Sequence, residues 1–252
     1  MNDEDKSLDL TGMGKLAKAI PASSWNKLVK TACDTFTQLL SPITSATTGL
    51  GRLIQAKFDG MVDAQKVLAA DAVKKATEKV TNTGKKPKGN PKSLIMIRAI
   101  ENASNETDPN LREIWSNLMA NEIIDNQVHP EFPKLLERLS SNDAVTLAEI
   151  ADACKKDSVK KATRSVVYGL QIMGVSFSAL VEEASDFSRE HLQNLSLIKK
   201  TSGQWRLTLF GEEFLKAVAD PAFEYIQAEQ INSADAKSRA ADFDVSNLIN
   251  IM

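Results

Sequence analysis

The sequence predicts a mainly α-helical protein, with a helical N-terminal region, then a helical bundle, then a winged-helix-like module that contains one β-hairpin. Three observations support this fold class. Apolar residues recur at helical spacing over residues 108–121 and again over residues 50–80. The one convincing strand signal comes late, at residues 195–209, where two short apolar runs flank a turn. A chain of 252 residues with 42% hydrophobic content can form one large or two small domains.

The N-terminal part of the chain is expected to be helical and basic. A helix is predicted from Ser23 or Ser24 to about Ser41. One long helix is predicted from about Leu50 to Val80, and its alanine-rich face can either pack within the monomer or form a coiled coil with a second copy. Four of its lysines are expected mostly outside the apolar stripe, namely Lys66, Lys74, Lys75 and Lys79.

Residues 108–121 form the helix with the clearest pattern. Asp108 can cap this helix, and Pro109 suits its first position because that residue needs no N–H donor. The buried face is expected to hold Leu111, Ile114, Trp115, Leu118 and Met119. The polar side is expected to hold Arg112, Glu113, Ser116, Asn117 and Asn121. We therefore interpret Trp115 as a core residue.

Further helices are predicted on both sides of this one. A helix that begins at Pro91 should pair with it in antiparallel fashion, and His129 is expected to cap a third helix. Ser140 and Asp143 have the spacing of a capping box at the start of a fourth helix. Asp157 is expected to cap a fifth helix that reaches Met173.

A β-hairpin and one more helix complete the prediction. The strands are expected at Leu195–Lys199 and Trp205–Leu209, with Gly203 taking a positive φ in the turn, and a helix follows over Phe210–Ala219. Helices followed by a hairpin with basic residues indicate a winged-helix-like module. The predicted regions are a disordered tail (1–11), a basic helical region (12–84), a helical linker (85–129), the winged-helix-like domain (130–231) and a mobile tail (232–252).

The charge of the chain is unevenly distributed. Residues 11–88 carry 13 lysines and arginines against 5 acids, whereas residues 89–252 carry 17 against 24. Such asymmetry either attracts an anionic partner or serves solubility and docking within the chain, and we favour the second interpretation. Cys33 and Cys154 are distant and form no C-x-x-C pair, which is typical of free thiols in the cytoplasm. We see neither a signal peptide nor a membrane span in the sequence.

No catalytic or metal-binding motif is found. His129 and His191 are isolated in the sequence, and neither begins an H-E-x-x-H pattern. Gly49 and Gly51 do not complete a phosphate-binding loop and are expected to permit a bend or a close helix approach. The acids Glu182, Glu183 and Asp186 are better explained as a solvated helix face. We therefore expect no enzyme activity, no cofactor and no metal.

Nucleic-acid binding is the strongest site-level alternative to a protein contact. Basic residues lie around the fourth and fifth predicted helices and on the hairpin, and phosphate contacts from both can converge there. We favour a protein contact, because many winged helices bind proteins, this half of the chain is acidic and no base-reading pattern of arginine or asparagine is found. The candidate residues are Lys155, Lys156, Lys160, Lys161, Arg164, Lys199, Lys200 and Arg206.

Three segments, taken in order, resemble one family. They are NPKSLIMIRAIENASNETDPNLREIWSNLMANEI, VHPEFPKLLERLSSNDAVTLAEI and LQNLSLIKKTSGQWRLTLFGEEFLKAV. Together they resemble the bacterial abortive-infection alpha family, which is associated with phage resistance. The resemblance covers the middle half of the chain and implies a mainly helical protein that acts in phage exclusion. For the first 80 or so residues the resemblance extends only to being helical and basic.

The resemblance implies phage defence through binding, and several partners stay open. The first is another protein of host or phage, and the second is nucleic acid. A third is an anionic membrane surface, approached by the basic segment at residues 50–80, and a fourth is a second copy of the chain through the long helix. A winged-helix transcriptional regulator without a defence role is the chief alternative function.

Overall fold

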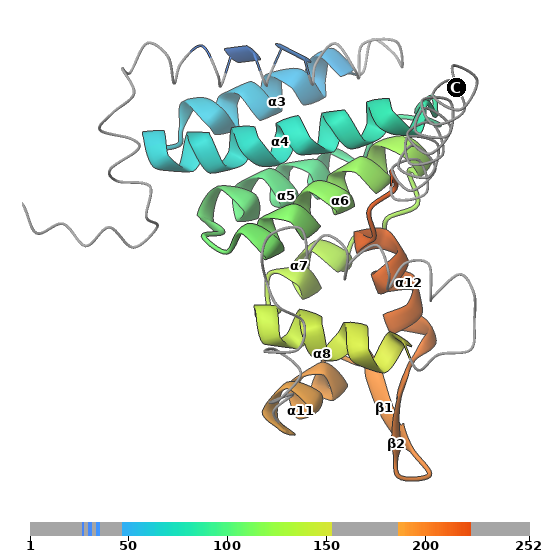
Figure 1. Cartoon of the computed structure of the whole chain (residues 1–252). Helices are drawn as coiled ribbons and strands as arrows, with labels where there is room; N and C mark the ends of the chain where they lie inside the picture. The colour runs from blue at the N-terminus through green and yellow to red at the C-terminus, as the bar shows by residue number, and fades with distance from the viewer. Residues whose placement is uncertain (1–26, 28–29, 32–33, 36–46, 153–185, 223–252) are drawn as a thin grey trace, which may run out of the picture.

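The computed structural model describes residues 27, 30, 31, 34, 35, 47–152 and 186–222. This part of the chain is mainly helical, with one small antiparallel sheet (Figure 1). The predicted tails, most of the first helix, both cysteines and the helix from Asp157 to Met173 lie outside the described residues. The elements are α3 (Thr47–Asp59), α4 (Asp63–Thr83), α5 (Ser93–Asn105), α6 (Pro109–Asp125), α7 (Phe132–Leu136), α8 (Ser141–Asp152), α11 (Asp186–Asn194), β1 (Ile198–Thr201), β2 (Gln204–Leu207) and α12 (Leu209–Val218).

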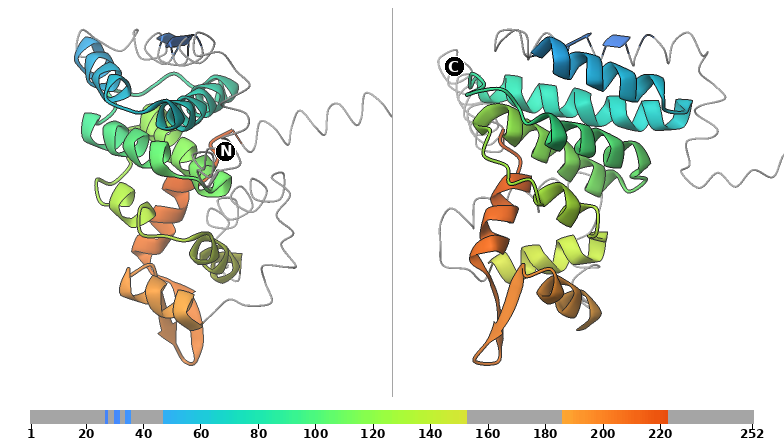
Figure 2. Two further views of the ribbon diagram at one scale, coloured as in Figure 1. Left: turned by 90° about the vertical axis from the view of Figure 1, so that its left-hand side faces the viewer. Right: turned by 180° about the vertical axis from the view of Figure 1, so that it is seen from behind.

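The helices form a layered body with the hairpin at one end. In Figure 1, α3 and α4 lie above the α5–α6 pair, while α7, α8, α11 and the hairpin lie below it. Helix α12 runs between α6 and the hairpin in every view (Figure 2). One hydrophobic core contains residues from Leu50 to Val218, so it joins helices on both sides of the segment 81–91. The order α8, α11, hairpin, α12 is compatible with the expected winged-helix-like module.

The single long helix predicted for residues 50–80 is wrong. The chain forms α3 and α4, separated at Gly60–Val62, where Val62 has the extended conformation φ −75° and ψ 161°. Glycine has a low helix propensity, and the Gln65 side chain accepts a hydrogen bond from the Val62 backbone N–H at 3.2 Å. A local cap therefore starts a new helix at this point. The apolar face of α4 packs against α5 and α6 within the monomer.

Helix α6 is capped as expected but is buried over most of its circumference. The Asp108 side chain accepts a hydrogen bond from the Asn110 N–H at 2.7 Å, with Pro109 at the first helical position. Trp115 is 1% exposed and belongs to the core. The prediction that Ser116 and Asn117 lie on a polar side is wrong, because both are buried. Helices α4, α5 and α12 all pack on α6, which leaves this helix little surface for solvent.

The helix starts that follow α6 are close to the predicted positions. Ser140 and Asp143 form the predicted capping box, with the Ser140 N–H bonded to Asp143 Oδ2 at 2.9 Å. The prediction that His129 caps the third helix is off by two residues, because the N-cap of α7 is Glu131. His129 still supports this turn, since its Nδ1 accepts a hydrogen bond from the Glu131 N–H at 3.2 Å. Helix α5 begins at Ser93, two residues after the predicted Pro91.

The β-hairpin is confirmed, with shorter strands than predicted. Ser202 and Gly203 both have positive φ, 51° and 79°, as a tight two-residue turn requires. Lys199 pairs with Arg206 and Lys200 with Trp205. Leu195 precedes the first strand, since its N–H bonds back to the carbonyl of His191 in α11. The last helix starts at Leu209, one residue before the prediction.

Candidate functional site

The structure describes three of the eight predicted nucleic-acid-binding residues. Lys199, Lys200 and Arg206 lie on the hairpin, and all three side chains are exposed. The other five, Lys155, Lys156, Lys160, Lys161 and Arg164, lie outside the described residues. The convergence of helix and hairpin therefore stays a prediction.

The hairpin places two of its cations directly opposite each other, which does not favour folding. Lys199 lies directly opposite Arg206 on the neighbouring strand, and like charges in this position destabilise a sheet. The Lys200 ammonium lies 5.4 Å from the centre of the Trp205 ring, which holds a third positive charge on the other face. No described carboxylate forms an ion pair with these residues. The hairpin extends from the end of the body opposite α3 (Figure 1), so its cations can meet a partner.

A polar seam between α6 and α12 fixes the helix that follows the hairpin. We define this seam by Glu113, Asn117 and Asn121, which recur every four residues and so lie on one side of α6. Asn117 Nδ2 donates to the Val218 carbonyl at 2.9 Å, and Asn121 Nδ2 donates to the carbonyls of Ala217 and Ala219 at 2.8 and 2.7 Å. The last carbonyls of a helix have no partner within the helix. The two asparagines therefore cap the C-terminus of α12.

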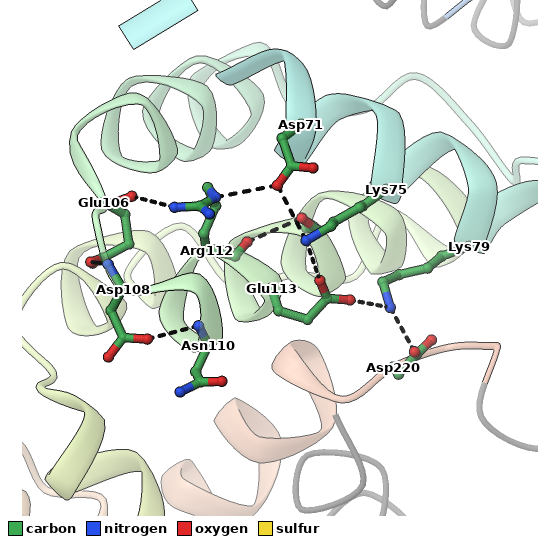
Figure 3. Close-up of polar contacts among 10 residues, drawn as sticks. Asp71, Lys75, Lys79, Glu106, Asp108, Asn110, Arg112, Glu113 and Asp220 are labelled. Atoms are coloured by element: carbon green, nitrogen blue, oxygen red, sulfur yellow. Dashed lines mark hydrogen bonds and ion pairs between the residues drawn. The ribbon is translucent and has the colours of Figure 1, made fainter. Parts of the chain in front are cut away.

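Glu113 adds an ion-pair network to the seam (Figure 3). Lys79 Nζ lies 2.7 Å from Glu113 and 2.6 Å from Asp220, which joins α4, α6 and the end of α12. Lys75 bridges Glu113 and Asp71 at 3.1 and 3.2 Å. Arg112 extends the network, with its Nε 3.2 Å from Asp71. The sequence predicts Lys75 and Lys79 mostly outside the apolar stripe of their helix. In the structure both lysines form ion pairs with Glu113 on α6.

The network holds its two main partners in the charged state. Burial opposes the charge of Glu113, but Lys79 and Lys75 outweigh it, so the pKa of Glu113 falls below its ordinary value. Burial likewise opposes the charge of Lys79, but Glu113 and Asp220 outweigh it and raise the pKa of Lys79. The seam is thus an ionised contact at neutral pH.

Both histidines have structural contacts in the folded chain. His191 Nδ1 lies 3.1 Å from Asp143 Oδ2 and so links α11 to the capping box of α8. His129 lies against Phe132 and Phe210, with ring centroids 5.6 and 6.3 Å apart. Of the three acids interpreted as a solvated helix face, only Asp186 is described, and it is exposed and pairs with Arg189. Within the described residues, no group of three histidine, cysteine, aspartate or glutamate side chains is placed to hold a metal ion.

The comparisons with known proteins identify the family. The family model described as abortive infection alpha matches residues 64–237, which is more than half of the chain. The chain belongs to the abortive infection alpha family. No curated protein and no solved structure matches the sequence. The matched segment begins at the start of α4. It therefore includes α4, which lies outside the three segments that carry the resemblance in the sequence.

The abortive infection alpha segment contains both the polar seam and the hairpin. In the run E-I-W-S-N-L-M-A-N, Glu113, Asn117 and Asn121 are the residues that hold α12 in place. The four-residue spacing of Glu113, Asn117 and Asn121 was a signal in the sequence, but nothing in the sequence named the helix they contact. Glu122 on α6 is another buried polar residue that the sequence did not single out. It is fully buried and accepts hydrogen bonds from the backbone N–H groups of Lys92 and Val128.

Replacing Lys79 with methionine should weaken this seam in the abortive infection alpha fold. The change leaves Glu113 and Asp220 without their shared cation, and we expect the free energy of unfolding at pH 7 to fall by about 2–3 kcal/mol. A urea titration measures this loss. The same change at the exposed Lys74, whose pair with Glu78 is 3.7 Å long, should cost no more than about 0.5 kcal/mol.

The effect of Lys79→Met should shrink in acid. The folded-state pKa of Glu113 is lowered, so its contribution is present above the unfolded value of about 4.3 and is lost as the pH falls through the folded pKa. The raised pKa of Lys79 affects stability only at strongly alkaline pH. An equal loss at pH 7 and pH 3 would show that the ion pairs are not the source of the effect.

Proposed function

We propose that this protein defends its host against phage by abortive infection, and that it acts by binding another macromolecule, without a catalytic step. Family membership over residues 64–237 supports the biological role. Plating a broad panel of phages on cells with and without this gene tests that role. Fewer plaques for at least one phage are expected with the gene present. Equal plating across the panel would contradict the proposal.

The hairpin is the surface that we propose for binding, and nucleic acid is the partner that it fits best. The observation that carries this proposal is the direct opposition of Lys199 and Arg206, with Lys200 held over Trp205. An opposed pair of exposed cations that costs folding stability is explained if phosphates neutralise it. The aromatic ring of Trp205 is partly exposed and offers a face for stacking beside the charges.

Reversing the charges of the hairpin should reduce nucleic-acid binding. We expect the triple change of Lys199, Lys200 and Arg206 to glutamate to abolish binding of DNA or RNA by the protein at low salt. Fluorescence anisotropy over a series of salt concentrations measures the effect. If the single-residue variants still bind, each lost phosphate contact lowers the salt slope on duplex DNA by about 0.9.

A matched variant controls for overall charge. Arg52, Lys85 and Lys86 are exposed and lie away from the hairpin, and changing them to glutamate alters the net charge by the same amount. This control should keep most of the binding. Equal losses in both triple variants would show that the hairpin has no special role. If neither the unmodified protein nor the variants bind nucleic acid, an affinity pull-down during infection tests for a protein partner instead.

Two other functions from the sequence are distinguished by direct experiments. A DNA-binding regulator without a defence role predicts specific retention of one promoter fragment together with unchanged phage plating. A membrane-surface effector predicts flotation with anionic liposomes, but the apolar face of α4 is buried against α5 and α6 and is not free to enter lipid. No helix among the described residues has the length and apolar character needed to cross a membrane.

A further inference from the structure

A cavity of about 590 Å³ lies between the end of α6, the loop that follows it and α12. Its size is in the range of small-molecule sites. It is separate from the hairpin cations, and the proposed binding of a macromolecule makes no use of it. Its described walls include Asn121 of the polar seam and Ala217 of α12, so the cavity borders the contact that holds α12 in place.

One wall of the cavity is aromatic. His129, Phe132 and Phe210 lie within 5.5 to 6.3 Å of one another between ring centroids. Phe132 is buried and packs at 5.5 Å against the buried Phe214, which gives the wall a rigid backing. Leu209 at the cavity is 72% exposed, an unusual position for a large apolar side chain. This wall suits the flat or apolar body of an organic molecule.

Two carboxylates line the cavity and can reach a ligand. Asp125 and Glu213 both line it, and Lys216 is the one lysine among its described walls. Each carboxylate has a lysine partner on the surface, Lys88 for Asp125 at 2.6 Å and Lys216 for Glu213 at 2.7 Å. The two carboxylate side chains are 40% and 54% exposed, so a ligand can reach them. Exposed lysine pairs are weak and can be exchanged for another cation.

We propose that this cavity binds a small organic cation, with an aromatic or apolar body against the aromatic wall and a protonated amine that pairs with Asp125 or Glu213. Aromatic faces and carboxylates both attract such a cation, and the same combination disfavours an anion. The ligand would contact Leu209 and Phe210, the first two residues of α12.

Three probes of similar size test the charge preference. Phenethylamine, 2-phenylethanol and phenylacetate are titrated into the full-length protein, and binding is followed by amide chemical shifts in NMR spectra. We expect phenethylamine to bind at least about tenfold more tightly than phenylacetate, with the neutral alcohol between them. Equal affinities for the three probes, or no binding of phenethylamine at millimolar concentration, would overturn the proposal.

Variants test the position of the site. Glu213→Gln removes an exposed charge and is expected to weaken phenethylamine binding about threefold to tenfold, and Asp125→Asn should act in the same direction. Phe210→Ala should weaken all three probes. Glu137→Gln, an exposed change outside the cavity, should leave the affinities unchanged. Unchanged binding in both Glu213→Gln and Asp125→Asn would exclude this cavity, whatever the outcome of the phage-plating experiment.

Discussion

Replacing Trp115 with alanine is expected to lower the free energy of unfolding by about 3–5 kcal/mol, the cost of emptying a well-packed aromatic site. Trp115 is 1% exposed and is the largest fully buried side chain of the described residues. It lies on α6, which packs against α4, α5 and α12, so few neighbours are free to move into the space. Urea titration or calorimetry measures the loss.

A second tryptophan serves as the control for this change. Trp205 is only partly buried on the hairpin, and Trp205→Ala should cost about 1 kcal/mol. If Trp115→Ala left the melting temperature unchanged but abolished phage defence, Trp115 would be a functional contact and its assignment to the core would be wrong.

Replacing Gly211 with alanine is expected to destabilise the protein by about 3 kcal/mol, although alanine is the better helix former. A Cβ atom at this position would overlap the carbonyl oxygen of Leu197 and lie 2.9 Å from its carbonyl carbon. Both obstacles are backbone atoms at the start of the hairpin, and the Leu197 carbonyl also accepts a hydrogen bond from the Thr208 N–H. The hairpin can accommodate the new methyl group only by moving away from α12.

Gly49→Ala is the matched control for Gly211→Ala. Gly49 lies in α3, and a Cβ added there meets no atom within 4 Å, so the expected close approach at this glycine is not found. The substitution should therefore be neutral or stabilise the protein by up to about 1 kcal/mol. Urea titration of both variants gives the comparison. If they changed stability equally, the close contact of Gly211 with Leu197 would not constrain the fold.

The local features of the fold were predicted well because their causes lie within a few residues. Asp108 caps α6, Ser140 and Asp143 form the capping box of α8, and Gly203 takes a positive φ in the hairpin turn. Each of these interactions spans two or three positions in the chain, so residue type and spacing are sufficient to recognise it. The break at Gly60–Val62 is also local, but a continuous apolar period concealed it.

The candidate site was predicted only in part. Lys199, Lys200 and Arg206 were expected on the hairpin, and they lie there. Their opposition across the strands follows from the register, which the turn residues determine. The cavity beside His129 was not predicted, because its walls come from α6, the following loop and α12, almost 100 residues apart.

The sequence by itself determined the family, the mainly helical class, the hairpin and most helix starts. The tertiary structure alone decided which polar residues bind one another. Helical spacing predicts Asn117 and Asn121 on the polar side of α6, but both bind carbonyl groups at the end of α12. It likewise predicts Lys79 at the surface, but Lys79 pairs with Glu113 and Asp220. The physical reason is distance along the chain. Periodicity shows which side of a helix is apolar, but the partner of a polar side chain about 100 residues away depends on how the helices pack.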